Sequence, residues 1–195
     1  FIPLAEQTGL IRPLTAWVVA EAAVQAQAWW DAGHDVRCAV NLSMAAVADD
    51  RASAGLLRQL VAAAPRLTVE ITESWLADAR GREVVAELAA AGVALALDDF
   101  GTGWSSLASL RAFPVSRLKL DRQFVLDLDD DDRGQDLLRA VGELAAALGM
   151  DVVAEGVERP ATAARLRAAG FSLGQGFLWS PALSADELAT WAGWT

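Results

Sequence analysis

The 195-residue sequence is poor in cysteine, histidine and tyrosine. It contains one cysteine, Cys38, and one histidine, His34, and it contains no tyrosine. A lone cysteine excludes an internal disulfide and is typical of a reducing compartment. A lone histidine excludes a metal site built on several imidazoles. Any bound metal would be held mainly by oxygen atoms, which suits Mg²⁺ or Mn²⁺ better than zinc.

Positive charge and long apolar runs are also scarce. The chain carries 16 lysines and arginines against 26 aspartates and glutamates, a net charge of −10. This balance argues against binding to a DNA or RNA polymer, although bound cations would still permit a small anionic substrate. Glu21, Gln25 and Gln27 interrupt the longest helix-like apolar stretch, so no segment is predicted to span a bilayer. The first residues lack the charged n-region of a signal peptide. They also lack an initiator methionine, so we expect a piece of a longer protein.

Strand-like apolar runs alternate with alanine- and leucine-rich stretches of helical spacing. We expect strands over residues 36–43, 67–73, 93–99, 117–121, 151–155 and 173–177, and helices over residues 80–91, 135–148 and 160–169. Gly92, Gly149 and Gly170 follow these helices, where glycine commonly adopts the left-handed conformation that ends a helix. Pro160 stands where the first turn of a helix tolerates proline. Repeated strand-helix units predict a parallel α/β sheet, open or closed into a barrel.

The alternation of side chains along each expected strand favours the barrel. Leu95 and Leu97 share one face of their strand, whereas Ala96 and Asp98 share the other. The remaining strands repeat this pattern, and the small or polar face carries a polar side chain near the carboxyl end of the strand: Asn41, Glu70, Lys119, Glu155 and Gln175. In an open sheet both faces pack against helices, so polar residues would not recur on one side. In a barrel they converge on one mouth, where barrel active sites lie.

Two adjacent carboxylates, Asp98 and Asp99, end the apolar run of residues 93–97. A loop with two glycines follows directly, Phe100-Gly101-Thr102-Gly103. Two acids at the end of a buried strand are costly in a low-dielectric interior unless something neutralises their charge. A metal ion is the natural partner, so this pair predicts a metal-dependent active site.

Each candidate residue also has a purely structural interpretation. Asp99 could cap a helix that starts near Ser105. Lys119 could be a structural partner of Asp98 or Asp121, and Asn41 could bind backbone groups of a loop. The acidic run at residues 127–132 is expected to be a solvated loop. The functional interpretation is wrong only if all of these structural interpretations are correct at the same time, for residues that meet at one barrel mouth.

Seven short segments occur in a fixed order along almost the whole chain: Phe1-Ile2-Pro3-Leu4-Ala5-Glu6, Val40-Asn41-Leu42-Ser43, Glu70-Ile71-Thr72-Glu73-Ser74, Asp98-Asp99-Phe100-Gly101-Thr102-Gly103, Leu118-Lys119-Leu120-Asp121, Ala154-Glu155-Gly156-Val157-Glu158 and Gln175-Gly176-Phe177. Each segment is a weak signal alone. In this order they resemble the EAL domain, the phosphodiesterase domain that hydrolyses the bacterial second messenger cyclic di-GMP.

The resemblance implies a site for two divalent cations, Mg²⁺ or Mn²⁺. Asn41, Glu70 and Asp98 resemble the ligands of one cation. Asp98 would bridge to the second cation, which Asp99 and Glu155 would help to hold. Two cations about 3.5–4 Å apart can activate a water molecule and stabilise the leaving oxygen of a phosphodiester.

The resemblance also implies roles around the cations. Lys119 resembles the lysine that orients the attacking water, so it joins Glu155 and Asp99 as a catalytic candidate. Gln175 resembles a substrate-contacting residue, and Glu158 is a further candidate for a polar contact with substrate. Glu73 resembles the glutamate that braces the loop after Asp99, which lies near a dimer interface in relatives.

One departure from the family pattern affects the start of the chain. The Glu-Ala-Leu motif that names the family, whose glutamate binds a metal, occurs nowhere in this sequence. Six strands are expected where a closed barrel has eight. We therefore expect residues 1–195 to form an EAL-type domain with the fold of a TIM-like (β/α)8 barrel that is incomplete at its N-terminus. Such a barrel has exposed strand edges, which favour aggregation.

Three functions compete on this evidence. The first is a fragment of a cyclic di-GMP phosphodiesterase that forms linear pGpG, with impaired activity as it stands. The second is a non-catalytic EAL-like domain that binds cyclic di-GMP or has a regulatory role. The third is an unrelated barrel metalloenzyme, which the motif order disfavours. We expect the first for the parent protein, together with cytoplasmic location, attached sensory or GGDEF domains and a family-level tendency to form homodimers.

Overall fold

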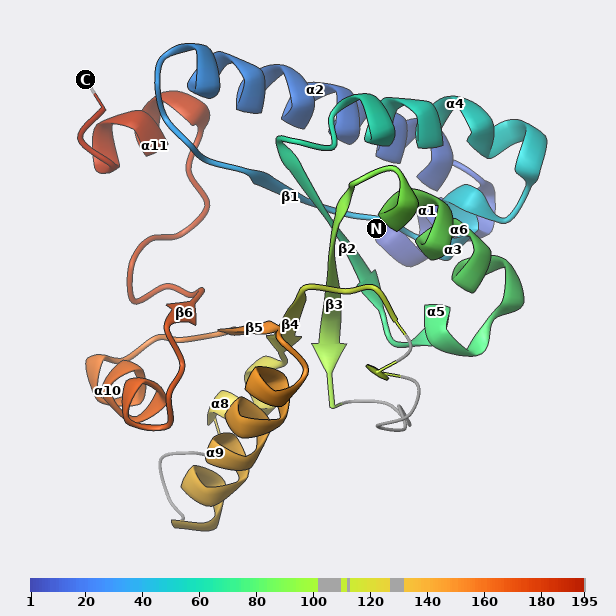
Figure 1. The fold of residues 1–195 in the computed structure, drawn as a ribbon. Helices are drawn as coiled ribbons and strands as arrows, with labels where there is room; N and C mark the ends of the chain where they lie inside the picture. Colours follow the sequence, from blue (N-terminus) through green and yellow to red (C-terminus); the bar gives the residue numbers. More distant parts are fainter. Residues whose placement is uncertain (102–109, 112, 127–131, 195) are drawn as a thin grey trace. The chain divides into compact units, whose positions relative to one another are not determined.

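The structure is a computed structural model that describes residues 1–101, 110–111, 113–126 and 132–194. Its strands form one sheet in the order β1-β2-β3-β4-β5-β6, which is also their order in the chain (Figure 1). All six expected strands are therefore present, although their ends differ by a few residues. The chain forms two compact units, Phe1–Arg117 and Leu118–Thr195.

The first unit contains three parallel strands and the helices that accompany them. Its elements are α1 (Ile2–Thr8), α2 (Ile11–Asp31), β1 (Cys38–Asn41), α3 (Met44–Val47), α4 (Asp50–Ala62), β2 (Leu67–Thr72), α5 (Ser74–Ala77), α6 (Ala79–Ala90) and β3 (Ala94–Phe100). The long helix α2 packs against β1 and β2 and lies beside α4 (Figure 1).

The second unit repeats the alternation of strands and helices. Its elements are β4 (Arg117–Leu120), α8 (Arg122–Leu126), α9 (Asp132–Ala147), β5 (Asp151–Ala154), α10 (Pro160–Ala168), β6 (Leu173–Gly174) and α11 (Ala185–Trp191). Strand β4 begins at the last residue of the first unit, and β5 pairs with β6 in parallel. The helix α11 begins with a capping box in which Ser184 and Glu187 bond each other's backbone N–H.

The expected helix ends are confirmed. Helices α6, α9 and α10 are followed by Gly92, Gly149 and Gly170, whose φ angles are 82°, 70° and 93°. Only glycine adopts this left-handed conformation without a steric penalty from Cβ. Pro160 lies in the first turn of α10, as expected, where its missing N–H costs no helical hydrogen bond.

Apolar strand residues form the core of the first unit. Leu67, Val69, Ile71, Leu95 and Leu97 are each at most 1% exposed. The expected alternation of side-chain exposure is clear in β1, whose four residues are in turn half-buried, exposed, buried and exposed. It is absent from the exposure of β2, whose first five residues are all buried. Among the helices that the structure describes, none has both the length and the apolarity needed to cross a membrane.

Candidate metal site and active site

Strand register in the first unit brings three candidate metal ligands to one face. Asn41 of β1 pairs with Glu70 of β2, and Glu70 pairs with Ala96 of β3. Asp98 lies two residues beyond Ala96, so its side chain leaves the strand on the same face as Ala96. Neighbouring strands lie about 4.8 Å apart, so side chains of this length can share a bound ion. The amide and carboxylate oxygens are hard donors, which fit Mg²⁺ or Mn²⁺.

The three side chains differ in their exposure to solvent. Glu70 is buried, with 8% of its surface exposed, whereas Asn41 is exposed and Asp98 is half-buried. A buried carboxylate is costly unless it has a partner or a cation. The gradient from buried Glu70 to exposed Asn41 is suitable for an ion that must also meet a solvent-borne substrate.

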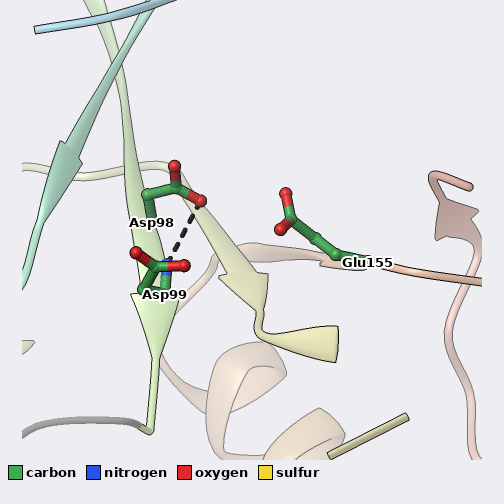
Figure 2. Close-up of side chains that lie close together, drawn as sticks. All are labelled: Asp98, Asp99 and Glu155. Carbon is green, nitrogen blue, oxygen red and sulfur yellow. Dashed lines mark hydrogen bonds between the residues drawn. The ribbon is translucent and has the colours of Figure 1, made fainter. Parts of the chain in front are cut away.

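Asp99 has an unusual backbone conformation for a residue that is not glycine. Its φ angle is 52°, and its N–H donates a hydrogen bond of 3.1 Å to Oδ1 of Asp98 (Figure 2). Aspartate is among the few residue types that enter the left-handed region, because a local hydrogen bond can offset part of the cost. Strain of this kind is concentrated at functional sites. The conformation exposes the Asp99 side chain and orients the Asp98 carboxylate.

Glu73 connects the end of β2 to the loop that follows β3. Its Oε1 accepts a hydrogen bond of 2.8 Å from the backbone N–H of Gly101. Its Oε2 is buried and has no hydrogen-bond partner among the described residues. This bond joins Glu73 to Gly101, the second residue of the loop 100–106 that Glu73 is expected to brace. Residues 102–106, which include Trp104 and the helix start expected near Ser105, lie outside the described residues.

In the second unit, Lys119 and Glu155 form an ion pair. Lys119 Nζ lies 2.7 Å from Glu155 Oε1, and the two side chains are 7% and 19% exposed. Backbone pairing supports this arrangement, because the N–H of Glu155 donates a hydrogen bond to the carbonyl of Leu120. Glu155 is thus a structural partner of Lys119 in addition to Asp98 and Asp121, the two partners considered from the sequence.

Gln175 is fixed by its backbone rather than by its side chain. Its N–H donates to the carbonyl of Ala154, and its carbonyl accepts from the N–H of Val157. The next residue, Gly176, lies against the backbone of Val157. A Cβ atom on Gly176 would be 2.2 Å from the Val157 carbonyl oxygen. The glycine therefore permits the backbone contact that positions Gln175, which is exposed.

A close contact also explains why glycine follows Glu155 after β5. Gly156 has a φ angle of 66°, and a Cβ there would lie 2.6 Å from Cβ of Arg122. Glu155, drawn in Figure 2, precedes this turn, and Glu158 is exposed two residues after it. Both glycines belong to segments that carry the family resemblance, but their steric role is visible only in the structure.

Comparison with known proteins gives the family. The family model described as "EAL domain" matches residues 1–182. The chain is 38% identical over 196 aligned residues to the cyclic di-GMP phosphodiesterase PdeR of Escherichia coli, covering 98% of this chain and 30% of that protein. It is 40% identical to the bifunctional diguanylate cyclase/cyclic di-GMP phosphodiesterase MucR of Pseudomonas aeruginosa, covering 96% and 28%.

A solved structure gives the same result for the fold. The structure described as PaMucR phosphodiesterase in complex with c-di-GMP superposes with a TM-score of 0.88 at 38% identity, covering 96% of this chain and 78% of that chain. The expected α/β barrel-type fold is thereby confirmed. The chain spans less than a third of the length of the two curated relatives. The protein described here belongs to the EAL domain family.

Proposed function

We propose that this chain is the phosphodiesterase domain of a protein that hydrolyses cyclic di-GMP to linear pGpG. The observation that carries the proposal is the strand register that sets Asn41, Glu70 and Asp98 on one face near the carboxyl ends of β1, β2 and β3. The named activities of the relatives PdeR and MucR supply the substrate.

Five residues would hold two divalent cations, Mg²⁺ or Mn²⁺. These are Asn41, Glu70, Asp98, Asp99 and Glu155. When bound, such cations lower the pKa of a coordinated water and stabilise negative charge on phosphate oxygens. Other side chains of this chain would bind and orient the nucleotide and the water.

The reaction breaks one of the two phosphodiester linkages of the ring. The oxygen of water joins phosphorus, one P–O bond to a ribose oxygen breaks, and that oxygen takes up a proton. Lys119 would orient the water, because its ammonium group favours the negatively charged form of a nearby oxygen. Gln175 and Glu158 would contact the nucleotide through hydrogen bonds.

A second function remains open, in which the domain binds cyclic di-GMP without hydrolysing it. The observation that favours it is the ion pair between Lys119 and Glu155, since a lysine engaged by a carboxylate is less available to water. Both functions share the same binding residues and differ only in turnover.

The experiment that separates the two functions measures binding and turnover on the same sample. Cyclic di-GMP is incubated with the purified whole protein and Mg²⁺ or Mn²⁺, because impaired turnover is expected of residues 1–195 alone. The linear product is separated by anion-exchange chromatography, and binding is measured by calorimetry. Formation of pGpG that stops with EDTA supports the phosphodiesterase. Binding without product supports the binding domain, and the absence of both contradicts both proposals.

Homodimer formation, attached domains and cytoplasmic location stay predictions. The short share of PdeR and MucR that this chain covers is the reason to expect further domains. Light scattering coupled to size-exclusion chromatography measures the oligomeric state of the chain directly.

A further inference from the structure

A hydrogen bond connects α1 to the residue that follows β1. Ser43 Oγ donates to Glu6 Oε1 over 2.6 Å, although the two residues are 37 positions apart in the sequence. Ser43 comes two residues after Asn41, the candidate metal ligand at the end of β1. The bond therefore ties the first helix of the chain to the segment that carries this ligand.

The geometry at Ser43 leaves its hydroxyl group a single orientation. Ser43 is the N-cap residue of α3, and its Oγ accepts a hydrogen bond of 3.2 Å from the N–H of Ala45. A serine hydroxyl has one proton to donate, and here it goes to Glu6. The residue between Asn41 and Ser43, Leu42, is 4% exposed, and its N–H bonds the carbonyl of Glu70.

Glu6 and Asn41 also line the same cavity of the first unit. The cavity has a volume of about 450 Å³, and its polar lining includes Glu6, Asn41, Ser43 and Thr72. Ala5 is the buried residue of α1, so apolar packing holds this short helix only lightly. The hydrogen bond from Ser43 is thus one of the described contacts that hold α1 beside β1.

We propose that Glu6 is a positioning residue for Asn41 and acts through Ser43. Its carboxylate holds the Ser43 hydroxyl, which holds the turn after β1 and so the direction of the Asn41 side chain. Partners of this kind orient metal ligands and strengthen metal binding without touching the ion. The inference rests on the proposed function to the extent that Asn41 binds a cation.

The test measures Mn²⁺ binding to the purified chain by electron paramagnetic resonance. Glu6→Ala and Ser43→Ala are expected to weaken Mn²⁺ binding by about tenfold, the lower end of the range for residues that orient metal ligands. Glu6→Gln and Ser43→Thr keep an acceptor and a donor, so they should stay close to the wild-type affinity. Ser43→Ala also removes the cap bond from Ala45, so the double variant should bind Mn²⁺ no more weakly than Ser43→Ala alone, because the bond between Glu6 and Ser43 is already absent there.

A matched control and a second readout make the outcomes distinct. Glu21→Ala removes an exposed carboxylate of α2 and should leave Mn²⁺ binding unchanged. The side-chain amide signal of Asn41 in NMR spectra without metal should shift or broaden in Glu6→Ala and recover in Glu6→Gln. An unchanged Asn41 signal in Glu6→Ala would overturn the positioning role. Equal losses in Glu6→Gln and Glu6→Ala would also overturn it, because charge rather than the hydrogen bond would then matter.

Failure of the proposed function has a different signature. If Mn²⁺ binds and does not broaden the Asn41 signal, Asn41 is not a ligand and the proposed ligand set is wrong. The dependence of the Asn41 signal on Glu6 can hold in that case, so the two proposals fail separately.

Discussion

Lys119 Nζ lies 2.7 Å from Glu155 Oε1, and both side chains are largely buried at the ends of neighbouring strands in the second unit. Removing two charges from water is costly, and each group makes the burial of the other tolerable. Two residues with separate expected roles, one toward water and one toward a cation, therefore depend on each other for stability.

Breaking this ion pair from either side should destabilise the fold. Lys119→Met or Glu155→Gln alone is expected to lower the free energy of unfolding by about 3 kcal/mol, because each change removes a close ion-pair contact from a largely buried group. Urea unfolding of each variant measures this. The exposed pair between Arg139 and Asp136 is a control, and Arg139→Ala should cost less than about 1 kcal/mol. Equal costs at the two pairs would contradict the burial argument.

Asp98 should be essential for turnover and dispensable for folding. Asp98→Ala removes the expected bridging ligand, so hydrolysis of cyclic di-GMP by the whole protein should be abolished and Mn²⁺ binding weakened. Asp98→Asn keeps an oxygen that can accept the N–H of Asp99, so it separates loss of charge from loss of that bond. A rate near that of the wild type in Asp98→Ala would refute the two-metal assignment.

The left-handed backbone at Asp99 predicts that glycine and alanine substitutions there differ in stability while both weaken metal binding. Asp99→Gly should be more stable than Asp99→Ala by about 1 kcal/mol, because alanine pays the steric cost at a φ angle of 52° and glycine does not. Both should weaken Mn²⁺ binding through loss of the carboxylate. Thermal unfolding and metal titration measure the two effects, and equal stability of the two variants would contradict the left-handed conformation.

Gly176 should not tolerate even a methyl group. The Cβ of Gly176→Ala would lie 2.2 Å from the Val157 carbonyl oxygen, so the backbone contact that positions Gln175 must open. We expect a loss of about 1–3 kcal/mol in unfolding free energy together with weaker binding of cyclic di-GMP. Gly55→Ala is the control, since nothing lies within 4 Å of a Cβ there. Within the helix α4 this change should stabilise the protein by about 0.5–1 kcal/mol.

The capping box of α11 predicts a local dependence on pH. Hydrogen bonds from the backbone and the hydroxyl of Ser184 lower the pKa of Glu187 below its ordinary value. The contribution to helix stability is therefore complete above the ordinary pKa of glutamate and is lost as the pH falls through the lowered value. NMR titration of the Glu187 carboxyl carbon measures the shift, and Ser184→Ala should return the pKa toward its ordinary value.

Local sequence patterns were sufficient to predict the strands and three of the helices. Apolar runs bounded by turn residues gave all six strands, and Gly92, Gly149 and Gly170 gave the ends of α6, α9 and α10. The last strand was predicted over residues 173–177 but spans only Leu173–Gly174, because Gly176 leaves the sheet to pack on Val157. A close contact between backbone segments leaves no signal in strand propensity.

The side-chain partners in the candidate site were much harder to predict. The position of Asp98 on the same face as Ala96 followed from strand periodicity, and the register pairs Ala96 with Glu70 and Asp98 with Thr72. The bond between Glu6 and Ser43 joins residues 37 positions apart, and the partner of Lys119 lies on another strand. The left-handed conformation of Asp99 was equally unforeseen, because aspartate is common in ordinary strand ends as well.

The register of β1, β2 and β3 has a consequence for how such domains change in evolution. Backbone hydrogen bonds and apolar side chains set this register, whereas Asn41 and Asp98 add little to the packed core. A substitution at either position should leave a well-folded chain that escapes the proteases and chaperones that remove unstable proteins. A variant that has lost catalysis can therefore remain abundant in the cell. Such an inactive but folded domain can evolve into a sensor.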